Sequence, residues 1–285
     1  MKYIVYILFF FPVWVTAQTY KYIGIEDGLS NRRIFNIQKD AQGYMWFLTN
    51  EGMDRYNGKD IKHYKLNKEG NTLDAPIRLG WLYTEPHIGI WVIGKQGRIF
   101  QYDANKDDFR MVYRLPDTSE TISCGYLDRN NNIWLCRKDT VLLYNIKDAR
   151  IFQFPNVLHS SITAIEQVDE HHFFIATEAG VRYVKQENNV LEIIPVETLD
   201  YFHAQVSELY FHQQLKRLFI GSFERGVFVY DMNTQEIIRP EADLSDVNIA
   251  RISPLNETEL LIATEGMGVY KVNANTCELE HYIVA

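Results

Sequence analysis

A histidine pair is the first feature of this sequence that could carry chemistry. His171 and His172 follow Asp169 and Glu170, and imidazole groups together with carboxylates can hold a metal ion. The four residues fall in an expected turn between two strands, where polar side chains are normally solvated. We therefore predict a solvated turn, with no metal and no cofactor.

The cysteines are a second candidate for chemistry. Cys124, Cys136 and Cys277 are too few and too scattered for a disulfide framework or a zinc site. Cys124 and Cys136 fall on two neighbouring expected strands, so a disulfide between them is one alternative in an oxidising compartment. The other alternative, which we favour, is a pair of buried free thiols.

No catalytic motif occurs in the sequence. A nucleophile elbow, a zinc-protease motif, a phosphate loop and a dinucleotide fingerprint are all missing. Carboxylates are numerous, but spacing singles out no pair. A glycosidase-like pair assembled from distant segments stays open as an alternative. We predict that the chain is not an enzyme.

Basic side chains recur at two kinds of position that we expect to share one end of the fold. One is the turn between a second and a third expected strand, and the other is the start of an inner strand. An anionic sugar would pair with such groups through charged hydrogen bonds. The alternative is a set of ordinary solvated turns, because acidic residues occupy equivalent positions at Glu51, Glu178, Glu224 and Glu265. The predicted ligand-binding residues are Arg33, Arg78, Trp81, Lys95, Arg137 and Arg225.

An internal repeat positions these residues. An apolar frame returns every 40 to 45 residues, at Trp46, Trp91, Trp134, Phe174, Phe219 and Leu261. Six copies of the repeat fill the chain near residues 30–70, 75–115, 120–156, 160–197, 204–240 and 247–285. Within the first copy, short apolar runs alternate with turns such as Asp40–Gly43 and Asn57–Gly58. Each copy therefore reads as four short strands.

A four-stranded unit repeated six times predicts an all-β fold, a β-propeller of four-stranded blades. We interpret the regularly spaced tryptophans as packing between blades. Tyr20–Ile25, ahead of the first copy, reads as an outer strand whose inner partners would belong to a seventh blade. We therefore expect an incomplete seven-bladed ring, with unpaired strand edges that favour association with another chain.

The first 17 residues have the features of a secretory signal peptide. Lys2 precedes an apolar run, Tyr3–Val15, and Ala17 fits the last position before a cleavage site. A membrane anchor is the alternative, but a spanning helix needs about 20 apolar residues, and Pro12 falls inside this run. We expect residues 18–285 to be the mature chain and its location to be the periplasm.

Composition argues against one class of partner. The formal net charge is −8, from 29 basic and 37 acidic residues, and no cluster of Lys or Arg is present. Neutralisation of phosphates supplies most of the affinity of proteins for nucleic acid. We therefore predict that the chain does not bind nucleic acid.

The stretch Glu26–Tyr64 resembles the first repeat of the two-component regulator propeller family. The resemblance rests on Asp27–Ser30, on the spacing from Asp40 to Trp46, and on Gly52–Gly58. The second and third copies resemble the repeat well, and the last three keep its outline. In this family the repeats form the N-terminal periplasmic sensor region of hybrid histidine kinases, typically in Bacteroidota.

The resemblance implies a sensor propeller for oligosaccharides released during polysaccharide breakdown. Members usually continue into a second propeller, a β-sandwich, a membrane helix and a kinase, which we expect to be absent from this chain. The implied partners are an oligosaccharide and either a second copy of the chain or a missing downstream propeller. Membrane contact would come only through absent downstream segments. The alternatives are an exported propeller lyase or glycosidase, and a protein-interaction scaffold.

Overall fold

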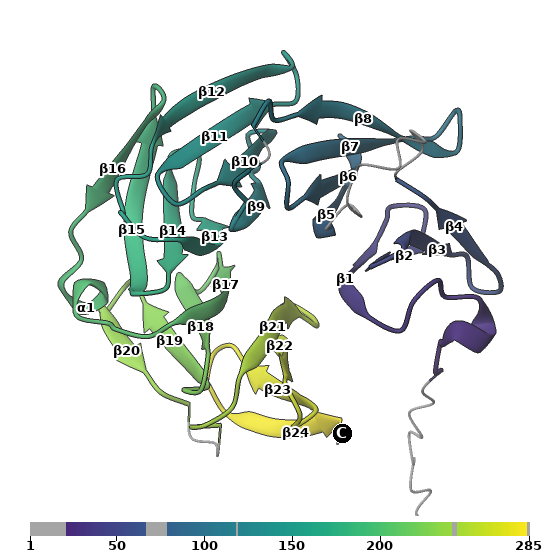
Figure 1. The fold of residues 1–285 in the computed structure, drawn as a ribbon. Coiled ribbons are helices and arrows are strands. Elements are labelled where there is room, and N and C mark those ends of the chain that lie inside the picture. Colours follow the sequence, from purple (N-terminus) through teal and green to yellow (C-terminus); the bar gives the residue numbers. More distant parts are fainter. Residues whose placement is uncertain (1–20, 67–78, 118, 241–243, 284–285) are drawn as a thin grey trace, which may run out of the picture.

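The computed structural model describes residues 21–66, 79–117, 119–240 and 244–283. Within them, 24 strands form six four-stranded antiparallel sheets around a common axis (Figure 1). The described part contains only two helical turns, the 3-10 turn Ile25–Asp27 and α1 (Glu197–Asp200). The predicted all-β fold is confirmed, and the protein is a six-bladed β-propeller. The expected signal peptide, residues 1–17, lies outside the described residues.

Each blade is built from four consecutive strands, and its first strand is innermost. The first three blades contain β1 (Ile34–Lys39), β2 (Met45–Thr49), β3 (Gly52–Tyr56), β4 (Ile61–Tyr64); β5 (Leu79–Glu85), β6 (Gly89–Gly94), β7 (Arg98–Asp103), β8 (Asp108–Arg114); β9 (Cys124–Leu127), β10 (Asn132–Cys136), β11 (Thr140–Asn145) and β12 (Arg150–Pro155). The other three contain β13 (Ile162–Gln167), β14 (His172–Thr177), β15 (Gly180–Glu187), β16 (Val190–Ile194); β17 (Val206–His212), β18 (Arg217–Ser222), β19 (Val227–Asp231), β20 (Glu236–Ile238); β21 (Ile249–Pro254), β22 (Glu259–Thr264), β23 (Val269–Asn273) and β24 (Leu279–Ile283).

Local turn chemistry fixes the strands of the first blade. The Asp40 carboxylate accepts hydrogen bonds from the backbone N–H groups of Gln42, at 3.0 Å, and Tyr44, at 2.9 Å, which closes the β1–β2 turn. Gly52 opens β3 with a φ of +140°. A Cβ at this position would lie 2.3 Å from the carbonyl oxygen of Tyr64, so only glycine lets β3 and β4 approach.

In the first five blades, the second strand carries a side chain that packs into the next blade. The buried aromatic residues at this position are Trp46, Trp91, Trp134, Phe174 and Phe219, each exposed by 2% or less. Trp46, for example, shares a core cluster with Leu82 and Val92 of the second blade. The interpretation of the tryptophans as packing between blades is confirmed.

The junction between the sixth and first blades differs from the other five. Consecutive inner strands pack side by side from β1 to β5 and onward to β21. Among the described residues no comparable contact joins β21 to β1. Figure 1 accordingly shows β24 and the C-terminus on one side of an opening and β1 on the other.

Ile37 on β1 identifies the surface that is left uncovered. Ile37 pairs with Phe47 across β1 and β2, as Leu82 pairs with Val92 across β5 and β6, so Ile37 and Leu82 occupy equivalent positions in the first two blades. Its counterparts in later blades include Leu82, Ile165, Leu209 and Ile252, which are exposed by 0% to 4% because each packs against the preceding blade. Ile37 is 49% exposed. The first blade thus presents an unpartnered packing surface.

The predicted strand Tyr20–Ile25 is wrong. Tyr20 lies outside the described residues, Lys21–Gly24 has no regular structure, and Ile25–Asp27 is a 3-10 turn. The Asp27 carboxylate accepts the backbone N–H of Gly24 at 2.9 Å, and this local bond favours a compact turn over an extended strand. The seventh blade itself stays a prediction.

A matched pair of core truncations tests the open junction. We expect Leu82→Ala to lower the free energy of unfolding by about 2 to 5 kcal/mol, because its side chain is enclosed. Ile37→Ala should cost less than about 1 kcal/mol, because half of its side chain is already in water. In a chain extended by one further repeat, Ile37→Ala should become as costly as Leu82→Ala. Urea denaturation measures all four values, and equal costs in the unextended chain would contradict the open junction.

Candidate functional site

The ring has two rims, one at each end of its axis. In an antiparallel blade, the start of the first strand and the turn between the second and third strands share one edge. We call this edge the mouth rim; it includes the turn 50–51 and its counterparts in the other blades. The other edge, with the β1–β2 turn 40–44 and its counterparts, is the opposite rim.

The structure places the described basic residues of the predicted site on the mouth rim. Arg33 directly precedes β1, and Lys95 directly follows β6. Arg137 lies in the β10–β11 turn and Arg225 in the β18–β19 turn. Arg78 lies outside the described residues. The four side chains thus come from four different blades at the same end of the ring.

Two of these arginines also brace the connections between blades. A guanidinium nitrogen of Arg137 donates to the backbone carbonyl of Asp117, and Arg137 Nε lies 3.9 Å from a carboxylate oxygen of Glu120. Arg225 donates to the carbonyl of His203 at 2.6 Å. Arg137 is half-buried, whereas Arg225 is exposed. Arg225 is therefore the more accessible of the two to a ligand.

Trp81, the predicted aromatic member of the site, is half-buried on β5. Its ring lies against Gly125 of β9, where an added Cβ would come within 2.7 Å of a ring carbon. Gly125 thus leaves room for the indole between the second and third blades. The main contact of Trp81 is packing between inner strands.

Two exposed aromatic side chains on the mouth rim were missed by the sequence analysis. Phe35 is 42% exposed, and the Arg33 guanidinium lies 5.1 Å from the centre of its ring. Phe223 is 37% exposed and lies two residues before Arg225. In both cases Phe and Arg are separated by one residue, and this spacing is the signal that could have found them.

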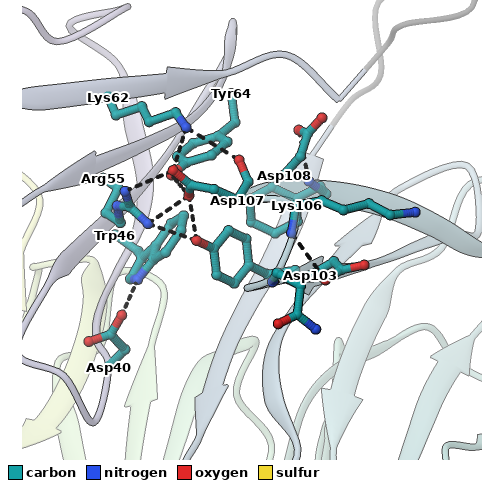
Figure 2. A network of polar contacts seen from close by, with 12 residues as sticks. Asp40, Trp46, Arg55, Lys62, Tyr64, Asp103, Lys106, Asp107 and Asp108 are labelled. Carbon is teal, nitrogen blue, oxygen red and sulfur yellow. Dashed lines mark hydrogen bonds and ion pairs between the residues drawn. The ribbon is translucent and has the colours of Figure 1, made fainter.

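On the opposite rim, a polar network ties the first blade to the second (Figure 2). The Asp107 carboxylate accepts hydrogen bonds from Arg55 at 2.9 Å, Lys62 at 2.6 Å, Tyr64 at 2.7 Å and Tyr102 at 2.5 Å. The bonds from Lys62 and then Tyr102 hold the pKa of the Asp107 carboxyl well below its usual range. The carboxylate therefore stays charged and fully engaged.

Aromatic rings surround the arginine of this network. The Arg55 guanidinium lies 4.8 Å from the ring centre of Tyr44 and 5.5 Å from that of Trp46. Trp46 Nε1 donates to Asp40 at 2.7 Å, and the Tyr102 ring meets Trp46 edge-on at 5.0 Å. These contacts hold the rings in place in the absence of any ligand.

A pair of carboxyl groups on inner strands is the nearest approach to a catalytic dyad. Burial raises the pKa of Glu166 to about 8, with a further increase from the charge of Glu208. Burial also raises the pKa of Glu208 to about 7, against the opposing effect of Arg251. Both groups have structural partners, because Glu166 accepts the backbone N–H of Phe211 and Glu208 lies 3.4 Å from Arg251 on the next inner strand.

The histidine and cysteine side chains also have local contacts. His172 Nδ1 lies 2.8 Å from Asp169, and its ring stacks on Tyr183. Cys124 and Cys136 pair directly across β9 and β10 as buried free thiols. Within the described ranges, no group of three or more His, Cys, Asp or Glu side chains is arranged to hold a metal ion.

Comparisons with known proteins identify relatives of one segment and of the fold. Residues 28–51 match the family described as "Two component regulator propeller". This segment is a two-component regulator propeller repeat. Side chains of this segment shape the first blade: Ser30 donates from its backbone N–H and its hydroxyl to the buried Asp54 carboxylate, both at 2.8 Å, and Asp40 accepts the indole N–H of Trp46 at 2.7 Å.

Solved structures share the fold at low sequence identity. The extracellular domain of BT3049, described as a hybrid two-component system of B. thetaiotaomicron, is 20% identical with a TM-score of 0.72, over 93% of this chain and 36% of that chain. The extracellular domain of BT4673 from the same organism, also described as a hybrid two-component system, is 18% identical with a TM-score of 0.68. The match covers 93% of this chain and 34% of that chain. Saccharomyces cerevisiae Sqt1 is 14% identical with a TM-score of 0.64, over 87% of this chain and 72% of that chain.

The chain therefore spans about a third of the length of the two bacterial domains. A search of curated protein sequences finds no match. In the part of the chain that the structure describes, no helix has the length and apolar character needed to cross a membrane.

Removal of one hydroxyl group tests the network on the opposite rim. Tyr102→Phe should lower the free energy of unfolding by about 1 to 2 kcal/mol, because Asp107 and Arg55 both lose a partner. Tyr113→Phe, on the neighbouring strand β8, is the matched control and should change it by less than about 0.5 kcal/mol. Equal effects of the two substitutions in urea denaturation would show that the network does not hold the blades together.

The raised pKa values of Glu166 and Glu208 predict a pH dependence. In the unfolded chain both carboxyls ionise near 4.5, whereas folding raises their pKa values to about 8 and 7. Their contribution to stability is therefore full below the unfolded pKa and is lost as pH rises through the folded pKa values. We expect the melting temperature to fall between about pH 5 and pH 8, and to fall less in Glu166→Gln. The control Glu192→Gln, at an exposed position, should show the same fall of melting temperature with pH as the unmodified protein. If Glu166→Gln also leaves that fall unchanged, the burial of Glu166 does not cause the pH dependence.

Proposed function

We propose that the protein is an extracytoplasmic sensing propeller of a two-component system. The observation that carries the proposal is the regulator propeller repeat at residues 28–51, on a fold shared with extracellular domains of such systems. The proposed location is the periplasm. A sensor needs a ligand site but no catalytic group, and this agrees with carboxyl groups that already have structural partners.

The proposed ligand is an oligosaccharide from polysaccharide breakdown, bound at the mouth rim. The pairs Arg33–Phe35 and Phe223–Arg225 support this choice. The C–H face of a sugar ring packs on an exposed aromatic ring, and an arginine pairs with a uronate or sulfate group through charged hydrogen bonds. Lys95 and Arg137 on the same rim would extend the positive surface.

The open junction supports a further part of the proposal. The uncovered surface around Ile37 would be closed by another protein surface, either a second copy of the chain or a downstream propeller segment. A signal could then pass from the ligand-bearing rim to this neighbour as a change in how the blades pack.

Charge reversal on the mouth rim tests the proposal. A ligand at about 100 times its dissociation constant adds about 2.7 kcal/mol of stability, which raises the melting temperature by several degrees. We expect oligogalacturonate or sulfated oligosaccharides to give such a shift in the unmodified protein. Arg33→Glu combined with Arg225→Glu should abolish it, and Lys147→Glu, at an exposed turn on the opposite rim, should not.

Two results would contradict this proposal. Shifts that survive the double charge reversal would place the binding site elsewhere. The appearance of new reducing ends or unsaturated sugars during incubation would identify an enzyme, the alternative function.

A further inference from the structure

A cavity of about 320 Å³ opens on the opposite rim, between the first and second blades. This size falls at the lower end of small-molecule sites. Its walls come from the β1–β2 turn, from β3, from the β5–β6 turn and from the end of β7. The lining residues that matter below are Ala41, Gln42, Tyr44, Arg55, Glu85 and Tyr102.

The third blade shows what the same turn looks like when this space is closed. Asp128 holds Trp134 at 2.9 Å, as Asp40 holds Trp46 in the first blade. The side chains after Asp128 reach across to the fourth blade: the Arg129 guanidinium donates to the backbone carbonyl of Gln167, and the Asn130 side chain donates to the carbonyl of Glu170 at 2.7 Å. These bonds fasten the turn onto the next blade.

In the first blade the corresponding residues are Ala41 and Gln42, which line the cavity instead. Ala41 has no side chain long enough to cross the junction. A hydrogen bond from Thr84, which also lines the cavity, to the carbonyl of Lys39, at 3.0 Å, joins the two blades here. The cavity is therefore caused by the side chains at positions 41 and 42, since the same turn in the third blade, with Arg129 and Asn130, is fastened to its neighbour.

The walls of this groove are fixed before a ligand arrives. Arg55 and Tyr102 are both held by Asp107, and Tyr44 lies against the Arg55 guanidinium. A wall that is already ordered loses little conformational entropy on binding, so more of the contact energy appears as affinity.

Charge decides which ligand fits the groove. Arg55 shares the Asp107 carboxylate with Lys62, whereas Asp40 and the exposed Glu85 add two carboxylates to the lining. The oxygens of Asp40 already accept bonds from its own turn and from Trp46. The groove therefore offers aromatic surface and a hydrogen-bond acceptor, Glu85, with a small excess of negative over positive side chains. This combination suits uncharged hydroxyl groups and repels a uronate.

We propose that this groove binds a neutral sugar ring and is a second saccharide site, distinct in rim and in charge from the basic mouth. The choice of ligand class rests on the proposed function; the place and the preference for a neutral sugar rest on the groove itself. The Glu85 carboxylate accepts sugar hydroxyl groups, and the Tyr102 and Tyr44 rings pack on the sugar ring.

A transplanted turn tests the site on the full chain. Ala41→Arg combined with Gln42→Asn copies the third-blade turn and should close the groove while leaving the fold and its melting temperature intact. The probes are neutral xylo-, manno- and cello-hexaose, with hexagalacturonate as the charged comparison, and binding is measured by isothermal titration calorimetry. Glu85→Gln is the milder variant, and Glu51→Gln, on the mouth rim, is its matched control.

We expect at least one neutral hexaose to bind the unmodified protein. Its affinity for the closed-groove variant and for Glu85→Gln should be at least tenfold lower, and its affinity for Glu51→Gln should be unchanged. Arg33→Glu with Arg225→Glu should leave that affinity unchanged. The inference is overturned if no neutral hexaose binds, or if binding is insensitive to both groove variants. If no neutral hexaose binds but hexagalacturonate does, and the mouth variants abolish that binding, the proposed function stands and this second site is ruled out.

Discussion

The structure depends above all on one contact, the side chain of the second strand that packs into the following blade in the first five blades. A single blade is a four-stranded sheet with two apolar faces and cannot hide them alone. Trp46, Trp91 and Trp134 bury almost their whole surface in this way, and Phe174 and Phe219 continue the pattern. The ring is therefore a chain of nearest-neighbour contacts. Where the chain of contacts stops, at Ile37, apolar surface is left in water.

This arrangement separates stability from recognition. The apolar contacts lie along the blade faces, so the turns at both rims are free to carry polar and aromatic side chains. On the mouth rim, Arg137 and Arg225 hold the connections between blades, and this fixes the positions of neighbouring exposed groups such as Phe223. On the opposite rim, the Asp107 network does the same for the first two blades. Each rim thus offers ordered groups at a junction between blades.

The spacing of the tryptophans was sufficient to predict the fold, because a large apolar residue every 40 to 45 residues has few other uses. The strand predicted at Tyr20–Ile25 is wrong because residue alternation carries no information on the hydrogen bond that the Gly24 backbone N–H donates to the Asp27 side chain. The mouth rim was predictable, since strand order fixes which turns share an edge. The groove was not predictable, because it arises where Ala41 lacks the guanidinium with which Arg129 contacts Gln167, a residue 38 positions away.

Hydrogen exchange of the full chain in the presence of a uronate-containing polysaccharide digest tests the central claim, that this ring binds oligosaccharides at its mouth rim without cleaving them. The account predicts slower exchange of backbone amides around residues 33–36 and 222–226, together with an unchanged size distribution of the sugars recovered afterwards. Unchanged exchange in both segments, or shortened sugars, would contradict it.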